Sequence, residues 1–301
     1  MSTLRGDTVR AAIDQVGKTF RTHGHPDPSH DAIGRRHLTI ERLLKGYVEV
    51  DSPTTRQPAL PLEVFRQLKR GAVSALDNAV AELACGALFF GMRSCEYLNT
   101  PGEPGQRRTK KLKVRNFTFR RGGNIVTSNA DLHKADSVSV TFENQKNGEK
   151  MEVVTQHRTG IKMCPVRAWG ATVARIRGYQ QSTEDTPIDA FQNRGKLFSI
   201  SGEVMRIYLR NAVKAVGESK LGFPAERVGT HSIRSSFAMM LLLNDEADSV
   251  VMKKGRWKSN AFLRYIRAQV SAYGINASKR MVNTKSDNFY VIPHIGKFKI
   301  S

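Results

Sequence analysis

Cysteine and acidic residues are scarce in this 301-residue chain, and both shortages narrow the range of functions. The three cysteines, Cys85, Cys95 and Cys164, are isolated and show no C-x-x-C spacing, which argues against a disulfide framework and a zinc ribbon. They favour a reducing, intracellular setting. There are 27 acidic residues against 48 basic ones, so the formal net charge is +21 and a polyanionic partner is expected.

Segments for export or membrane insertion are not expected in this sequence. Residues 1–25 are polar and charged, unlike a secretory signal peptide. The most apolar stretch, residues 79–92, contains Glu82 and is too short to span a bilayer, so we interpret it as a buried helix.

Motifs for cofactors are also scarce. No G-x-x-x-x-G-K-[ST] loop and no paired carboxylates of a two-metal nuclease occur, so neither a nucleotide nor a metal cofactor is predicted. One histidine-rich stretch offers an alternative, but its spacing matches no compact zinc pattern. That stretch contains His23, His25, Asp27, His30, Asp31 and His37.

The positive charge is spread through patterned sequence rather than confined to a tail. With 40% apolar residues the chain can build a core, and the combination indicates a folded nucleic-acid-binding protein, although a ribosomal or membrane-surface protein is an alternative. Residues 107–121 are the most basic segment, which is either a solvated face or, as we favour, a strand that contacts phosphates. Its basic residues are Arg107, Arg108, Lys110, Lys111, Lys113, Arg115, Arg120 and Arg121.

Hydrophobic periodicity predicts mainly helices with one small antiparallel sheet, which is an α+β fold. Three prolines between residues 51 and 61 indicate a linker, so we expect a short N-terminal helical domain over residues 1–57 and a larger domain over residues 58–301. Two alternating runs around Asn147-Gly148 predict a β-hairpin over residues 137–157, with Lys146 at its tip. Helices are expected over residues 7–22, 37–48, 62–68, 78–92, 164–177 and 202–216.

Several residues suggest phosphoryl-transfer chemistry. His231 and Arg234 are three apart and share one helical face, while Arg93 follows the apolar helix. Arginine matches phosphate oxygens bidentately, and Tyr265, eight residues after Trp257, could supply a hydroxyl nucleophile. Each feature has a structural alternative when taken alone: an arginine paired with a neighbouring glutamate, a helix-start histidine, or a packed aromatic residue.

Taken together and in this order, four segments resemble the tyrosine recombinase (phage integrase) family: GMRSCEYL, QKNG, HSIRSSFAMMLLL and GRWKSNAFLRYIR. The resemblance covers about residues 58–275, and the last segment is particularly similar to Cre-like and Crypton-type recombinases. It implies the tyrosine recombinase catalytic fold plus a short N-terminal helical domain, which together form a clamp around duplex DNA. It also implies a homotetramer on paired DNA sites, in the nucleus of a eukaryote or in the nucleoid-containing cytoplasm of a prokaryote.

The resemblance assigns a role to each matched residue. Tyr265 would form a 3′-phosphotyrosine, Lys146 would protonate the departing 5′ oxygen, and His231 would act as general acid/base. Arg93 and Arg234 would grip the phosphate, to which Trp257 would donate its indole N–H. Lys150, Tyr273 and Tyr290 are rival candidates for the lysine and the tyrosine. Additional DNA contacts are expected from Arg256, Lys258, Arg264 and Arg267.

Three other functions are compatible with the same residues. A type IB topoisomerase shares the chemistry but does not pair sites, a non-catalytic DNA-binding protein could keep the fold, and a basic RNA-binding protein would not depend on Tyr265. The segment after Tyr265, around Tyr290, could dock on a neighbouring protomer.

Overall fold

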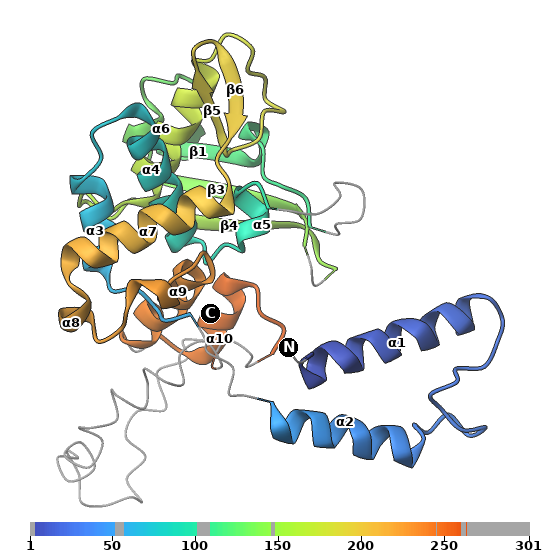
Figure 1. Cartoon of the computed structure of the whole chain (residues 1–301). Coiled ribbons are helices and arrows are strands. Elements are labelled where there is room, and N and C mark those ends of the chain that lie inside the picture. The colour runs from blue at the N-terminus through green and yellow to red at the C-terminus, as the bar shows by residue number, and fades with distance from the viewer. Residues whose placement is uncertain are drawn as a thin grey trace, which may run out of the picture. The chain divides into compact units, whose positions relative to one another are not determined.

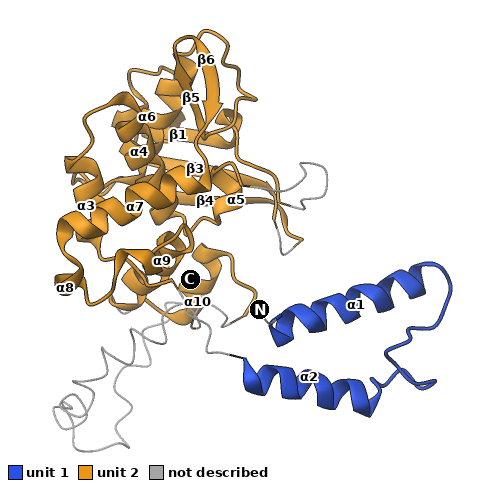
Figure 2. Cartoon of the chain, in the orientation of Figure 1, with its two compact units in different colours: residues 1–55 blue, residues 56–301 orange. Residues whose placement is uncertain are grey.

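The computed structural model describes residues 4–51, 57–100, 109–145, 148–244, 246–259 and 263. The chain divides into two compact units, Met1–Thr55 and Arg56–Ser301, which Figure 2 colours separately. Whether the first unit serves as a DNA-clamping domain stays a prediction.

The first unit is a pair of helices, α1 (Gly6–Thr22) and α2 (Leu38–Val50), which run in opposite directions (Figure 1). The start of α1 lies against the end of α2, where a Cβ atom added at Gly6 would come within 2.9 Å of Val48 Cγ2. The Gly6 N–H also donates to the Asp51 carboxylate at 2.8 Å. Leu44 is buried, whereas Leu43 is exposed, so the unit has a small core.

The second unit contains the remaining elements. Its helices are α3 (Leu62–Arg70), α4 (Ala75–Phe89), α5 (Ser94–Tyr97), α6 (Pro165–Arg177), α7 (Gly202–Val216), α8 (Glu218–Leu221), α9 (His231–Leu242) and α10 (Asp248–Gly255). Its strands are β1 (Phe117–Arg121), β2 (Asn124–Ile125), β3 (Ser137–Asn144), β4 (Lys150–His157), β5 (Ala190–Asn193) and β6 (Lys196–Ser199). Three short 3₁₀ helices are η1 (Val114–Asn116), η2 (Leu132–Lys134) and η3 (Ala225–Arg227).

Four strands form one antiparallel sheet in the order β2-β1-β3-β4. Strands β3 and β4 pair from Ser137 with His157 to Asn144 with Lys150, so residues 137–157 form the expected hairpin. In its turn, Gly148 has φ +86°, a left-handed conformation that glycine adopts without a steric cost. Phe142 of β3 is buried in the core, as the alternating pattern requires.

Trp169 of α6 is the centre of the core, because helices and sheet all pack on its indole. The Phe117 ring of β1 lies 4.6 Å from it and the Phe90 ring 6.5 Å, measured between ring centroids. Helix α4 approaches closely through Gly86, where an added Cβ would come within 2.5 Å of the indole. A side chain at this position would therefore separate α4 from α6.

The start of α4 is fixed by polar contacts as well. Ser74 and Asp77 form a capping box, in which each side chain accepts a hydrogen bond from the other residue's backbone N–H. The hydroxyl of Tyr208 on α7 donates to Asp77 at 2.6 Å, so α7 is tied to the first turn of α4. Burial and this bond raise the pKa of Tyr208 to about 12, so the hydroxyl keeps its proton.

The structure confirms a mainly helical fold with a small antiparallel sheet. It adds the β5–β6 hairpin, which the sequence analysis does not predict. The turn of that hairpin has two left-handed residues, Arg194 and Gly195, and the Asn193-Arg194-Gly195 sequence is the signal that could have revealed it. None of the helices in the described residues is long and apolar enough for a membrane crossing.

Replacing Gly86 by alanine tests the close packing of α4 on Trp169. We expect Gly86→Ala to lower the free energy of unfolding by about 1–3 kcal/mol, because the new methyl group overpacks a rigid core. Gly202→Ala is the matched control, since its Cβ would meet no atom closer than 3.9 Å, and it should be neutral or slightly stabilising. Equal effects in chemical denaturation would contradict the packing described.

Candidate active site

Three segments that are distant in sequence meet at the side chain of Arg234 on α9. One guanidinium nitrogen donates to the carbonyl of Gly91, 143 positions earlier in the chain. The other terminal nitrogen donates to the carbonyl of Gly255 at 2.6 Å. Arg234 is only 1% exposed, so it joins the segment before α5, the start of α9 and the end of α10 from inside the molecule.

Glu96 on α5 supplies the negative charge at this junction. Its carboxylate, 1% exposed, accepts hydrogen bonds from Arg93 Nη1 and Arg256 Nη2, both at 2.9 Å. Burial by itself raises the pKa of Glu96, but the charges of Arg256, Arg234 and Arg93 outweigh burial and hold it below its ordinary value. The carboxylate therefore stays ionised and compensates a group of three arginines.

Arg93 lies at the edge of the junction and is the most accessible of these arginines. Its side chain is 16% exposed, and its backbone N–H, at the start of α5, donates to Glu96 Oε2 at 2.8 Å. Besides Glu96, its guanidinium contacts the carbonyl of Arg256 at 3.3 Å and the side-chain oxygen of Gln145 at 3.4 Å. The pairing with Glu96 is thus part of a larger network rather than an isolated surface pair.

The burial of Arg256 corrects one expectation. We predict from sequence that Arg256 contacts DNA, yet its side chain lies in the core, on Glu96 and 3.5 Å from the centre of the Phe142 ring. It follows α10 in a left-handed conformation, with φ +58°, which turns the side chain inward. A guanidinium in this position is not available to a phosphate, so we leave Arg256 out of the DNA-contacting residues proposed below.

The indole of Trp257 covers Arg234. The Arg234 guanidinium carbon lies 4.1 Å from the centre of the indole, which also stacks against Phe237 with centroids 6.1 Å apart. The ring passes so close to Gly255 that an added Cβ would come within 1.7 Å of it. This explains the glycine of the G-x-W motif, because any other residue would displace the tryptophan from the arginine.

His231 is the first residue of α9, and its side chain is exposed. Its backbone N–H donates to the Gln57 side chain at 2.9 Å, which fixes the start of the helix. It lies one helical turn before Arg234, as the H-x-x-R spacing requires. Of the six catalytic candidates, the structure therefore brings Arg93, His231, Arg234 and Trp257 to one region.

The two other catalytic candidates, Lys146 and Tyr265, lie outside the described residues. The same holds for the rival tyrosines and for four of the expected DNA contacts, namely Arg107, Arg108, Arg264 and Arg267. Lys150, the rival of Lys146, is exposed at the start of β4. Gln145 and Gly148, which flank the unplaced pair of residues, form the turn through a hydrogen bond of 3.0 Å from the Gly148 N–H to the Gln145 carbonyl.

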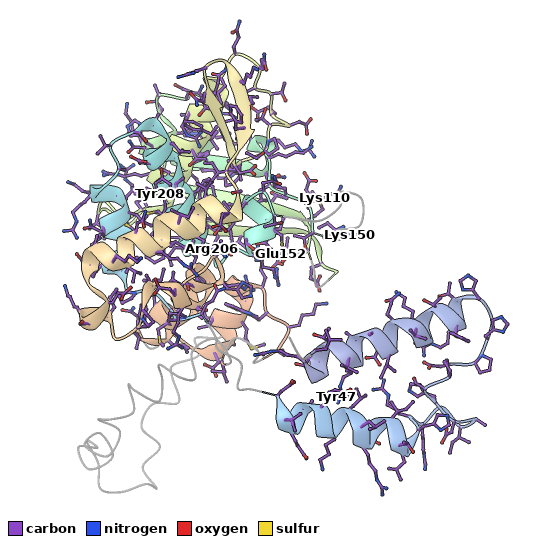
Figure 3. The ribbon with its side chains drawn as sticks, viewed as in Figure 1. Tyr47, Lys110, Lys150, Glu152, Arg206 and Tyr208 are labelled. Carbon is purple, nitrogen blue, oxygen red and sulfur yellow. The ribbon has the colours of Figure 1, made fainter. Side chains whose placement is uncertain are left out.

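The described basic residues differ in their surroundings. Lys111 binds the buried Asp189 carboxylate at 2.8 Å, and Lys113 and Arg115 both pair with Asp185. Lys110 projects next to the β3–β4 hairpin, where its N–H donates to the Asn144 carbonyl, and Figure 3 shows its side chain with Lys150 nearby. Exposed positions are also found for Arg120, Arg121 and Lys258, the last of which contacts Glu149 at 2.9 Å.

The histidine-rich stretch of the first unit contains one close histidine–carboxylate pair, His30 with Asp27 at 3.2 Å. No group of three or more His, Cys, Asp or Glu side chains in the described residues could hold a metal ion.

Sequence reasoning missed Glu96 and Gln145 as parts of the site. Glu96 is evident in sequence only as a possible surface partner of Arg93, and Gln145 only as a residue of the hairpin. No local pattern signals their burial, because the residues that bury them come from β3, β4 and α10. A tertiary structure is needed to identify them.

Charge removal at Glu96 gives a pH-dependent test. The folded carboxyl titrates below its ordinary pKa of 4.5, so its contribution to stability is fully present above that pH and is lost as the pH falls through the folded pKa. We expect Glu96→Gln to lower the free energy of unfolding by about 3–5 kcal/mol at neutral pH, because buried arginines lose their counter-ion. The difference from wild type should shrink in acid.

Glu203→Gln is the control for this experiment. Glu203 pairs with Arg206 on the surface of α7, and exposed pairs contribute about 0–1 kcal/mol. A wild-type-minus-variant difference for Glu96→Gln that does not shrink below pH 4.5 would contradict the assigned ionisation.

Comparison with known proteins gives a match at the level of structure. No protein-family model matches the sequence. A variant of the Tn1549 transposon integrase in complex with transposon right end DNA is 11% identical, with a TM-score of 0.52 over 93% of this chain and 80% of that chain. A second variant, in complex with a circular intermediate DNA, is 12% identical, with a TM-score of 0.51 over 90% of this chain and 80% of that one.

The XerH site-specific recombinase bound to palindromic difH substrate is 16% identical, with a TM-score of 0.49 over 89% of this chain and 64% of that chain. At such identities the likeness to the integrase concerns the fold, and a fold can host several functions. The sequence segments around Arg93, Arg234 and Trp257 predict this fold, and the structural match confirms it. The chain has the fold of the tyrosine recombinases.

Proposed function

We propose that this chain is a site-specific recombinase that cleaves and rejoins duplex DNA through a 3′-phosphotyrosine at Tyr265. One observation carries the proposal. Arg234 donates to the carbonyl of Gly255 and Arg93 to the carbonyl of the next residue, Arg256. Arg93 and Arg234, which are distant in sequence, are therefore anchored on two adjacent peptide groups. The next residue is Trp257, whose indole stacks on Arg234.

This arrangement suits a phosphoryl-transfer transition state. Charge accumulates on the non-bridging phosphate oxygens, and preorganised guanidinium groups stabilise it more strongly than the ground state. Preorganisation needs fixed side chains, and Glu96 and the two carbonyls hold both arginines. The net charge of +21 adds a long-range attraction to the DNA backbone.

The proposed cleavage step exchanges one phosphoester bond for another. The Tyr265 oxygen attacks the phosphorus while the bond to the 5′ oxygen breaks. His231 accepts the phenolic proton, and the Lys146 ammonium donates a proton to the departing 5′ oxygen. Because the phosphotyrosine keeps an ester bond, attack by a 5′ hydroxyl reverses the step, and no metal or nucleotide is required.

Trp257 has to move in this scheme. The Trp257 indole lies over the Arg234 guanidinium, which is almost fully buried. We propose that DNA binding displaces the indole sideways, so that Arg234 and the indole N–H reach the same phosphate. This displacement breaks the stacking of the indole on Phe237.

Duplex DNA and further copies of this chain are the proposed partners, assembled as a homotetramer on two paired sites. The proposed compartment is wherever that DNA lies, the nucleus or the nucleoid. Pairing of sites separates this function from that of a type IB topoisomerase, which cleaves one duplex by the same chemistry.

Covalent trapping tests the proposal. We expect wild-type protein, incubated in EDTA with nicked suicide duplexes from a library of genomic ends, to form a denaturant-stable protein–DNA band. Tyr265→Phe should abolish the band, because phenylalanine has no nucleophilic oxygen. Gel electrophoresis under denaturing conditions measures the yield, and native electrophoresis of the trapped complex measures how many protomers and duplexes it holds.

The controls are Tyr273→Phe and Tyr290→Phe, which should keep the band. A band that survives Tyr265→Phe but disappears in one of these variants would mean that a different tyrosine is the nucleophile. Tight duplex binding without any band would favour a non-catalytic DNA-binding protein.

Alanine substitution of the neighbouring Lys110 and Lys111 should distinguish a lysine that contacts DNA from a lysine that stabilises the fold. Lys110 has a side chain 64% exposed, so Lys110→Ala should reduce the slope of log K against log salt concentration by about 0.9, the value for one phosphate contact. Lys111→Ala should leave the slope unchanged but lower the free energy of unfolding by about 1–3 kcal/mol, because the buried Asp189 loses its partner.

Fluorescence-anisotropy titrations at several salt concentrations and urea unfolding measure the two effects. Equal loss of salt dependence in both variants would contradict the distinction between these lysines.

A further inference from the structure

Gln145 is a buried polar residue at the end of strand β3, directly before Lys146. It is 0% exposed, and both ends of its side-chain amide have partners. The oxygen accepts from Arg93 Nη1 at 3.4 Å, and the nitrogen donates to Glu152 Oε2 of β4. An arginine can only donate and a carboxylate only accept, so these two partners fix the orientation of the amide.

The backbone of Gln145 is held as well. Its N–H donates to the carbonyl of Glu149, and its own carbonyl accepts from the N–H of Gly148, each at 3.0 Å. Side chain and main chain are therefore fixed together at one residue.

The contacts form a continuous series of charged and polar groups. Glu96 binds Arg93, Arg93 contacts Gln145, and Gln145 donates to Glu152. The first two residues belong to the buried arginine junction, and the last two to the hairpin, on whose strand β4 Figure 3 labels Glu152 and Lys150. Gln145 is thus the hairpin residue that contacts Arg93, while Phe142 of β3 lies against Arg256.

We propose that Gln145 is a positioning residue for the proton donor of the cleavage step: it holds the residue that directly precedes Lys146 in the sequence in a fixed register with Arg93. This inference rests on the proposed function. In the proposed step Arg93 binds the non-bridging oxygens, and Lys146 protonates the 5′ oxygen of the same phosphate. A connection between these two residues would therefore set the distance between the phosphate-binding group and the proton donor. A misplacement of about 1 Å in such a group can cost about 100-fold in rate.

A bridging-sulfur substrate tests this role. When sulfur replaces the 5′ bridging oxygen, the leaving group departs as a thiolate, which is stable without a proton and needs no general acid. We expect Gln145→Met to cleave the ordinary duplex about 10- to 100-fold more slowly than wild type, and the sulfur duplex within about threefold of wild type. Lys146→Met should show the same rescue with a larger defect on oxygen.

Gln156→Met is the matched control. Gln156 lies near the other end of β4 and donates to the Phe89 carbonyl at 2.7 Å, so the same substitution removes a hairpin hydrogen bond without touching Arg93. Any cleavage defect of this variant should be the same on oxygen and sulfur duplexes. DNA affinity and thermal unfolding of all variants, measured in parallel, keep stability effects apart from the rescue.

A polarity exchange provides a second measurement if Gln145→Met folds poorly. In Gln145→Glu, a carboxylate at position 145 would still accept from Arg93 but would repel Glu152, so cleavage should fall about 10-fold or more. Adding Glu152→Gln supplies a donor to that carboxylate, and the double variant should recover most of the lost rate.

The outcomes are distinguishable. An equal defect of Gln145→Met on both duplexes, or no defect on either, would overturn the positioning role, as would the failure of Glu152→Gln to restore Gln145→Glu. If wild-type protein forms no covalent complex on either duplex, the proposed function itself fails.

Discussion

The buried carboxylate of Glu96 is the interaction on which the rest of the site depends. Three guanidinium groups gather in the interior of a chain whose net charge is already +21, and like charges in a low-dielectric interior repel strongly. One ionised carboxylate, bonded to two of these groups, makes the arrangement possible. Buried ion pairs add little net stability compared with an apolar core, but loss of one partner is costly, so the geometry is strictly maintained.

Two glycines allow the main chain to approach the buried Arg234 guanidinium closely. Arg234 donates to the carbonyls of Gly91 and Gly255, and neither position has room for a side chain. At Gly91, with φ +50°, an added Cβ would come within 2.6 Å of the Phe237 ring. The backbone can therefore approach the guanidinium from both sides, and the arginine is oriented by peptide groups as well as by a carboxylate.

These two constraints divide the residues of the proposed site into a buried arginine network and the hairpin that adjoins it. Arg93, Arg234 and Glu96 form a single buried network that includes the end of α10. The hairpin adjoins this network at two places, through the amide of Gln145 and through the Phe142 ring, which lies against Arg256. Rigid anchoring suits groups that stabilise charge, since their value depends on fixed dipoles.

Local sequence patterns suffice to predict the fold class, the positions of most helices, the β3–β4 hairpin and the proximity of His231 to Arg234. These features depend on local periodicity, turn chemistry and helical spacing, which neighbouring residues specify. Three features become visible when the chain is folded: Arg256 is buried, Trp257 covers Arg234, and Glu96 and Gln145 adjoin the arginines. They cannot be predicted from local patterns because burial and charge pairing arise between segments far apart in the chain. An Arg-Trp pair after a glycine looks the same in sequence whether its arginine faces DNA or the core, and only the left-handed turn after α10 distinguishes the two.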